Sequence, residues 1–447
     1  MPKGFYLLIA AQFSSALADN ALLIVAIALL EVQGLPGWWA PLLRFSFVAS
    51  YVLLAPFVGP LADALPKPSL MAWMNAAKAL GVLGMLAAAH PALAFGVVGL
   101  AAATYAPAKY GLVTEMVKPD NLVAANGWIE VSAVGAVLLG AVLGGFLVSD
   151  HVRAIDSVLN AALLTSFGNI FDAVPYLFSL LVLLLVYALA GVLNARVPTS
   201  GARYARPSID PTQLVRDFYA ANRTLWCDRE GGLSLAVTTV LWGVAATLQF
   251  AVLRWSIDVL GLELAHAAYL QGTVAVGVVV GAGLAGRSVR IESVHRLLPV
   301  GVLLGLLVLS VTLIDRVALA VPALLVVGGL GGFLLVPMNA LLQHRGFWLL
   351  SAGRSIAVQG FNENLSVLCS LGLYSLVLAA GAPIVGVMIG FGITVAIVLA
   401  LLLLRLRFAD MRVARAVRTN VSADVHLRAQ HLGAAHEWTD ADRREKH

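Results

Sequence analysis

Two ionisable residues lie deep inside long apolar stretches of the sequence. Asp19 precedes Asn20 with apolar sequence on both sides, and Lys78 lies one turn after Asn75 in another such stretch. A carboxylate inside a membrane costs at least about 2.5–3.5 kcal/mol, so it is expected to face an internal cavity and to have a partner. Asp19 therefore either forms a structural ion pair or hydrogen bond between helices, or it binds a cation, a proton or a cationic headgroup.

A further basic residue, Lys109, follows Pro107 near the end of an apolar stretch. The proline removes a backbone donor and can bend a helix. The ammonium of Lys109 could bind a phosphate as a point charge. It could equally reach the membrane surface while its methylene stem stays in the apolar layer. The residues alone leave both interpretations of Lys109 open.

The composition explains why these charges stand out. The chain has 447 residues, of which 60% are hydrophobic and 12% charged, and its mean hydropathy is +0.90. Soluble domains contain about 25% charged residues, so soluble enzymes, nucleic-acid-binding modules and disordered scaffolds are unlikely classes for this sequence. Two cysteines, Cys227 and Cys369, provide neither a disulfide framework nor a zinc-binding spacing.

The apolar residues form blocks of the length needed to cross a bilayer, about 20 residues. Such segments are helical, because an unpaired backbone group in lipid costs several kcal/mol. We therefore predict an all-α membrane protein. The twelve predicted spans are roughly 4–30, 39–62, 69–89, 92–116, 121–148, 174–194, 231–256, 264–286, 296–314, 317–343, 354–379 and 383–407.

The distribution of basic residues predicts the orientation. The apolar run continues past residue 18, so we interpret the first block as a span and not as a cleaved signal peptide. With both termini on one side, that side holds 24 of the 29 Lys and Arg residues, the other side holds four, and Lys78 lies within a span. The positive-inside rule then places both termini in the cytoplasm.

The chain is predicted to consist of two halves of six spans. The predicted parts are a bundle at 1–194, a cytoplasmic linker at 195–230, a second bundle at 231–408 and a disordered cytoplasmic tail at 409–447. The linker contains either a short amphipathic helix on the inner leaflet or only solvated chain. Three motifs recur in the same order in both halves: Gly59–Asp63, Pro107–Lys109 and Gly127–Glu130 in the first, Gly283–Arg287, Pro337–Asn339 and Gly360–Glu363 in the second. This parallel repeat is typical of the major facilitator superfamily.

The segment from Gly59 to Lys67 indicates a conformational latch. Gly59 permits close helix packing, and Asp63 can accept hydrogen bonds at a neighbouring helix end or pair with a basic residue. Such a contact would favour one state of a two-state transporter. The alternative is an ordinary turn containing Pro66 and Pro68.

Two further groups of residues allow a functional interpretation. Glu130 and Glu363, with neighbouring amides, could form a gate between the halves or could serve as helix caps and interfacial polar residues. His151 and Asp156 match the His-x4-Asp pattern of glycerolipid acyltransferases, in which the pair acts as a general base. The pattern is short, and no phosphate-binding element follows it. No nucleotide-binding loop is found, so we expect no ATP, cofactor or metal.

Several motifs together resemble the bacterial lysophospholipid transporters (LplT), a branch of the major facilitator superfamily. The resemblance covers about residues 5–407. The matching segments are Ala18–Leu23, Leu54–Gly59, Asn75–Lys78, Tyr105–Gly111, Ala125–Glu130, Val336–Gln343 and Ala357–Gln359.

The resemblance implies a flippase that moves lysophosphatidylethanolamine and related lysolipids from the outer to the inner leaflet of a bacterial inner membrane, without ATP or an ion gradient. It also implies a separate cytoplasmic partner, an acyltransferase–acyl carrier protein synthetase, that re-acylates the lysolipid. Membrane lipids are expected to contact the protein, and nucleic acid is not. One departure is Gln249, where the family commonly has an arginine.

The predicted mechanism is alternating access by two rocking halves, with the headgroup in a polar cavity between them. Asp19 and Asn20 would lie near the ethanolamine ammonium, and Lys78 or Lys109 near the phosphate. The predicted substrate-binding residues are Asp19, Asn20, Asn75, Lys78, Tyr105, Lys109, Gln249 and Asn339, and the predicted gating residues are Gly59, Asp63, Lys67, Glu130 and Glu363. The alternatives are a proton-coupled drug or metabolite transporter and, more remotely, a membrane acyltransferase.

Overall fold

The computed structural model describes residues 1–36, 39–167, 174–204 and 210–406, and these residues form helices and no strand. Eleven helices in this part of the chain are long and apolar enough to cross a membrane, and a bent pair, α2 and α3, makes up to twelve. The chain divides into two compact units, Met1–Ala396 and Ile397–His447. The predicted tail at 409–447 lies outside the described residues.

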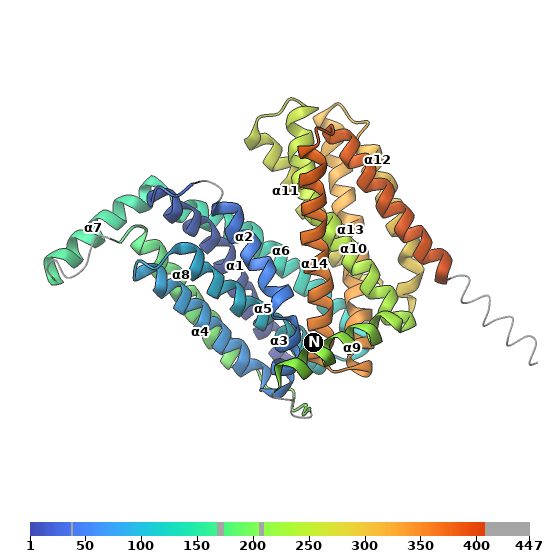
Figure 1. Cartoon of the computed structure of the whole chain (residues 1–447), viewed down its shortest axis with the longest axis horizontal. Helices are drawn as coiled ribbons and strands as arrows, with labels where there is room; N and C mark the ends of the chain where they lie inside the picture. Colours follow the sequence, from blue (N-terminus) through green and yellow to red (C-terminus); the bar gives the residue numbers. More distant parts are fainter. Residues whose placement is uncertain (37–38, 168–173, 205–209, 407–447) are drawn as a thin grey trace, which may run out of the picture. The chain divides into compact units, whose positions relative to one another are not determined.

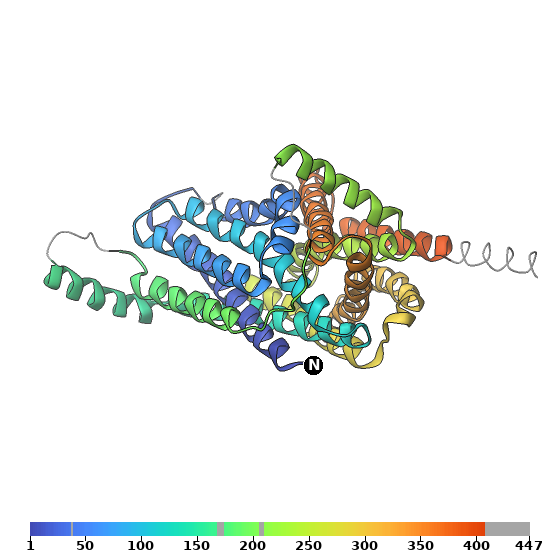
Figure 2. The same cartoon turned by 90° about the horizontal axis from the view of Figure 1, so that it is seen from below.

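Each predicted span coincides with a helix or with a closely linked pair, which confirms the all-α membrane fold. Figures 1 and 2 show the helices. The helices are α1 (Lys3–Val32), α2 (Trp39–Leu53), α3 (Ala55–Ala64), α4 (Lys67–Leu86), α5 (Pro91–Met116), η1 (Pro119–Asn121), α6 (Leu122–Leu147), α7 (Asp150–Phe167), α8 (Leu177–Ala195), α9 (Pro211–Cys227), α10 (Arg229–Asp258), α11 (Leu264–Ser288), η3 (Ile291–Leu297), α12 (Leu298–Val311), α13 (Val317–Leu349) and α14 (Ala352–Ala379), followed by the candidate span Ile384–Leu406.

The second span is bent by 64° between α2 and α3. Pro56 lies in the first turn of α3 and Pro60 lies inside it. Because proline has no backbone N–H and crowds the preceding turn, these residues favour a break at this point. Because of the break, α3 runs in a different direction from α2. This direction places Gly59 and Asp63 of α3 against the second half.

The linker contains helix α9, and its apolar face packs on protein. Phe218, Ala221 and Leu225 are buried in a cluster with residues of α3, α10, α13 and α14. The buried face of α9 therefore contacts protein, and the location of this helix at the inner leaflet stays a prediction. Asp228 then caps α10 by accepting the backbone N–H of Gly231 at 2.8 Å.

Asp228 also fixes the linker to the second half. It accepts hydrogen bonds from Arg345 Nε at 2.9 Å and Nη2 at 3.0 Å. Burial acts to raise the pKa of Asp228, but the hydrogen bonds from Arg345 and from the Gly231 backbone outweigh it, so the pKa lies below its ordinary value. The carboxylate therefore stays ionised and the two-bond contact persists at neutral pH.

The connection between α6 and α8 contains helix α7. His151 and Asp156 both lie on this helix. Residues five apart on an α-helix point about 140° away from each other, so the two are not placed as a general-base pair. Asp156 instead accepts the backbone N–H of Phe178 at 2.6 Å, at the start of α8, and His151 is exposed. The structure therefore gives no geometric support to the acyltransferase pattern.

Helices α11 and α13 pack backbone to backbone through glycines. A Cβ atom at Gly281 would overlap the carbonyl oxygen of Gly329, and one at Gly328 would overlap that of Val274. Gly277 and Gly332 face the partner backbone equally closely. Small residues allow such approach in membranes, where packing rather than the hydrophobic effect joins helices.

Candidate functional site

A polar cluster lies in the apolar interior of the first half, between α1, α4 and α8. Lys78 Nζ lies 2.6 Å from Asp19 Oδ2 and donates to Ser15 Oγ at 2.9 Å. The Ser15 hydroxyl donates to Asn75 Oδ1 at 2.7 Å, and the Tyr187 hydroxyl donates to Asp19 Oδ1 at 2.8 Å. We call these five residues the Asp19–Lys78 cluster.

The cluster holds one positive and one negative charge. The side chain of Lys78 is 2% exposed and that of Asp19 is 14% exposed. Ions removed from water are stabilised only when they are paired and their remaining donors and acceptors are satisfied. The aromatic rings of Tyr105 and Tyr187 lie 5.4 and 5.8 Å from the ammonium, which places further negative potential around it. Asp19 is the more accessible of the two ions.

Helical spacing explains how the sequence builds this cluster. Ser15 and Asp19 are four residues apart on α1, and Asn75 and Lys78 are three apart on α4, so each pair shares one helix face. Ser15 and Tyr187 are not among the predicted site residues. Ser15 could have been found as the polar residue one turn before Asp19, and Tyr187 as a hydroxyl within the apolar sequence of α8.

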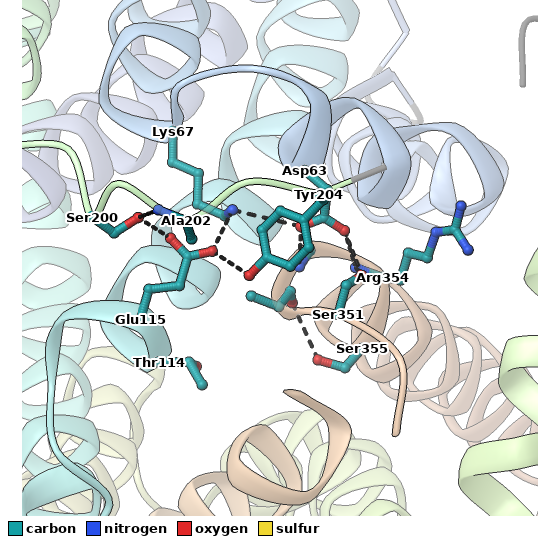
Figure 3. A network of polar contacts seen from close by, with 12 residues as sticks. Asp63, Lys67, Thr114, Glu115, Ser200, Ala202, Tyr204, Ser351, Arg354 and Ser355 are labelled. Carbon is teal, nitrogen blue, oxygen red and sulfur yellow. Dashed lines mark hydrogen bonds and ion pairs between the residues drawn. The ribbon is translucent and has the colours of Figure 1, made fainter. Parts of the chain in front are cut away.

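A second polar cluster joins the two halves, on the side of the spans where the linker lies (the linker side). Asp63, at the end of α3, accepts the hydroxyl of Ser351 at 2.5 Å and the backbone N–H groups of Gly353 at 2.8 Å and Arg354 at 3.3 Å (Figure 3). These groups form the N-terminus of α14, where unpaired N–H groups and the helix dipole favour an anion. Asp63 thus binds the positive end of the α14 helix dipole.

Lys67 and Glu115 extend this contact within the first half. Lys67 Nζ lies 2.6 Å from Glu115 Oε1 and 3.5 Å from Asp63 Oδ1. All three side chains are at most 5% exposed. We call Asp63, Lys67, Glu115 and Ser351 the latch. Its three charges come from the first half, and only the contacts of Asp63 with Ser351 and the start of α14 cross to the second half.

The linker binds to the same glutamate. Ser200 donates to Glu115 Oε2 at 2.5 Å, and the Tyr204 hydroxyl donates to Glu115 Oε1 at 2.6 Å (Figure 3). Lys67 Nζ lies 4.7 Å from the centre of the Tyr204 ring. Burial and the hydrogen bond to Glu115 raise the pKa of Tyr204 above its ordinary value, so the phenol stays protonated and remains a donor.

Further contacts close the linker side. Asn126 of α6 and Gln343 of α13 exchange two amide hydrogen bonds, of 2.9 and 2.8 Å. Gly59 packs against Ala357, and a Cβ atom there would lie 2.9 Å from the Ala357 Cβ. Together with the latch, these contacts join the halves at the ends of their helices and exclude a passage at this side.

The chain is similar to known transporters in both sequence and fold. Residues 8–347 match the Major Facilitator Superfamily. The chain is 40% identical over 391 residues to the lysophospholipid transporter LplT of Enterobacter sp. (strain 638), which covers 87% of this chain and 92% of that protein. It is also 40% identical to LplT of Citrobacter koseri, over 90% of this chain and 95% of that protein. The chain belongs to the LplT family.

Solved structures support the fold of this LplT family member. A bacterial homologue of the iron transporter ferroportin, in an outward-facing state, aligns with a TM-score of 0.65 and 15% identity, covering 90% of this chain and 99% of that chain. The E. coli fucose:proton symporter aligns with a TM-score of 0.68 and 15% identity, covering 90% and 98%. At this identity the likeness shows the shared fold alone.

The structure does not gather all predicted substrate-binding residues into one site. Asp19, Asn75 and Lys78 are brought together, and Tyr105 lies beside them. Asn20 instead donates to the carbonyl of Ala16 on its own helix at 2.8 Å. Lys109 Nζ lies over the ring of Tyr110, 4.1 Å from its centre.

Gln249 and Asn339 also lie apart from Asp19. Gln249 is exposed on α10 and takes no part in the contacts that hold Asp19. The basic partner of Asp19 is Lys78 in its own half, so the ion pair does not require an arginine at position 249. Asn339 accepts a hydrogen bond from Gln359 at 2.9 Å within the second half.

The two predicted gating glutamates lie close enough to interact electrostatically with each other and with Tyr110. Glu130 is buried on α6. Glu363 on α14 accepts a hydrogen bond at 2.8 Å from Gln359, the amide that also reaches Asn339. Neither glutamate takes part in the latch contacts, which come from Glu115, Asp63 and Lys67. Their role in gating stays a prediction.

We predict that Tyr204→Phe loosens the linker while the latch remains. The change removes one hydrogen bond to a charged group, worth about 1.5–3 kcal/mol. The rate at which trypsin cleaves the linker after the exposed Arg203, a reaction that requires local opening of the chain, should rise at least about fivefold. Tyr219→Phe, an exposed tyrosine on α9, is the matched control. An unchanged rate in Tyr204→Phe would show that this bond does not hold the linker.

Proposed function

We propose that this protein moves lysophospholipids, in particular lysophosphatidylethanolamine, from the outer to the inner leaflet of a bacterial inner membrane without ATP. The proposal is supported by its membership of the LplT family and by relatives named as lysophospholipid transporters over about nine-tenths of its length. The many membrane-spanning helices agree with transport across a bilayer.

The observation that carries the proposal is the Asp19–Lys78 pair. A zwitterionic headgroup has an ammonium and a phosphate a few bonds apart, and the pair offers one partner of each sign. A bound headgroup would exchange partners with the protein, its ammonium taking Asp19 and its phosphate taking Lys78. Because each ion keeps a counter-charge throughout, no charge is left unpaired in the apolar interior.

The sparse polar lining suits an amphipathic substrate. Beyond the five residues of the cluster, its surroundings are aromatic and aliphatic, as in the buried core of α1, α4 and α8 around Tyr187. A sugar would need many hydrogen-bonding side chains, whereas a lysolipid needs them only at its headgroup. The acyl chain would stay against apolar helix faces or in the bilayer.

The latch provides the two-state element that alternating access needs. In the structure the linker side is closed by Asp63, Asn126 and Gln343. The excess of basic residues on that side supports a cytoplasmic location for it and for both termini. Opening would break the latch and expose the Asp19–Lys78 cluster to the inner leaflet. A separate cytoplasmic acyltransferase–acyl carrier protein synthetase would then re-acylate the product.

The experiment is uptake into proteoliposomes of lysophosphatidylethanolamine, lysophosphatidylglycerol and diacyl phosphatidylethanolamine, side by side. Each lipid is fluorescent, and albumin extraction removes the fraction left outside. We expect protein-dependent uptake of the lysolipids and none of the diacyl lipid. Equal rates with empty liposomes would contradict the proposal.

A protonophore added to the same vesicles distinguishes the proton-coupled alternative, in which Asp19 carries the proton. We expect lysolipid uptake to continue when the proton gradient is collapsed. Abolished uptake would instead establish coupling. Acyl transfer by the purified protein that disappears in His151→Ala would favour an enzyme, against the placement of His151 and Asp156 on different sides of α7.

A further inference from the structure

Helix α7 buries a carboxylate and exposes two large aliphatic side chains. Val152 and Asp156 are buried, while Ile155 is 46% exposed and Val158 is 70% exposed. At 100° per residue, Ile155 and Val158 lie within 60° of each other on the helix. The buried face thus carries a carboxylate next to Val152, and the exposed face carries two aliphatic side chains together with His151.

Polar contacts fix which face of α7 turns inward. Asp156 accepts the backbone N–H of Phe178 at 2.6 Å. Asn160 donates to the carbonyl of Val174 at 3.1 Å and accepts its N–H at 3.0 Å. Asp156 and Asn160 are one turn apart, so they share a face. The exposed stripe lies roughly opposite, because Val158 is about 160° from both residues around the helix.

The position of α7 places it at the edge of the bilayer. It begins at Asp150, three residues after α6 ends at Leu147, and Ser179 of α8 donates to the carbonyl of Leu147 at 2.8 Å. The ends of two spans are therefore tied together where α7 starts. Figures 1 and 2 show α7 extending to the side of the bundle, so the helix stays near the level at which these two spans end.

The end of α6 that precedes α7 also exposes large apolar side chains. On α6, the last turns before α7 expose Val142 (71%) and Phe146 (57%), side chains that a membrane span presents to acyl chains. Charged residues of α7 lie elsewhere on the helix, with Arg153 paired to Asp150 at 3.2 Å in the open.

We propose that α7 is an interfacial membrane helix on the side opposite the linker, with Ile155 and Val158 among the acyl chains. Arg153 and Asp150 reach the headgroup layer or water. The partner of this surface is thus lipid. This arrangement of an apolar face in the acyl boundary and a charged face outward is what stabilises amphipathic helices at interfaces.

The test measures the depth of two neighbouring positions. In the C227S/C369S background, Val158→Cys and Ser157→Cys are each labelled with a polarity-sensitive fluorophore in phosphatidylethanolamine–phosphatidylglycerol vesicles. Both positions are exposed and lie about 100° apart around the helix. We expect nitroxide-labelled lipid to quench the label at 158 at least about threefold more than that at 157, and aqueous iodide to show the opposite order.

Three outcomes would overturn the proposal. Equal quenching at both positions would place α7 in water. A label at 158 shielded from lipid and iodide alike would indicate a protein partner, and shielding that vanishes on dilution in lipid would identify a second copy of this chain. None of these readouts depends on transport, so the result stands whether or not lysolipid uptake is observed.

Discussion

Asp19→Asn is expected to lower lysolipid uptake at least about tenfold and also to destabilise the protein, because it leaves the buried ammonium of Lys78 without its counter-charge. Removing one partner of a buried ion pair costs about 3–5 kcal/mol. The double variant Asp19→Asn/Lys78→Gln contains no unpaired charge, so it should regain much of the thermal stability. Uptake should stay low, because neither ion of the headgroup then finds its partner.

This comparison separates the two interpretations of Asp19 that the sequence leaves open. If the pair were only structural, the double variant would recover both stability and transport. The measurements are thermal unfolding in detergent and uptake in proteoliposomes on the same preparations. Ser14→Ala is the matched control on α1, since Ser14 donates only to the carbonyl of Ala10 and its loss should change neither quantity.

Asp63→Ala is expected to shift the protein toward a state that is open at the linker side. The carboxylate accepts three hydrogen bonds from the start of α14, and each bond to a charged group is worth about 1.5–3 kcal/mol. Even one such contribution changes a two-state equilibrium about tenfold or more. Uptake should fall, because a transporter that rests in one state completes fewer cycles.

The shift can be measured at Ala357, which is 4% exposed and packs against Gly59. A cysteine at 357 in the C227S/C369S background should react with a maleimide at least about tenfold faster when Asp63 is replaced by alanine. Asp120→Ala, an exposed acidic residue of η1, is the control. An unchanged rate, in protein whose unfolding temperature shows that it is folded, would mean that Asp63 does not hold the closed state.

The spans could be predicted well because the bilayer imposes a length and a composition on each of them. Helix α7 could not be predicted in this way. Its sequence from Asp150 to Phe167 mixes charged and apolar residues and is not apolar enough for a membrane span. Its fold depends on Asp156 and Asn160, whose partners Phe178 and Val174 come later in the chain. No pattern in the sequence of α7 itself predicts these contacts.

The sequence predicts which residues belong to the candidate site better than it predicts the contacts between them. Asp19 and Lys78 stand out because charge is rare in apolar sequence, but nothing local shows that they pair across 59 positions. The acceptor role of Asp63 follows from its motif, whereas Ser351 lies 288 positions away. Gln249 is a predicted site residue because the family commonly has an arginine at that position. In the structure, Asp19 already has Lys78 as its cationic partner.

The glycine contact between α11 and α13 has a consequence for mutational tolerance and stiffness. At Gly277, Gly281 and Gly328 even alanine would collide with backbone, which cannot rotate aside as a side chain can. Deep mutational scanning should therefore find these positions as intolerant as any in the chain. Two helices joined so closely also have little freedom to slide past each other. We therefore expect α11 and α13 to move as one rigid body during transport, with bending confined to the junctions between the second half and the first.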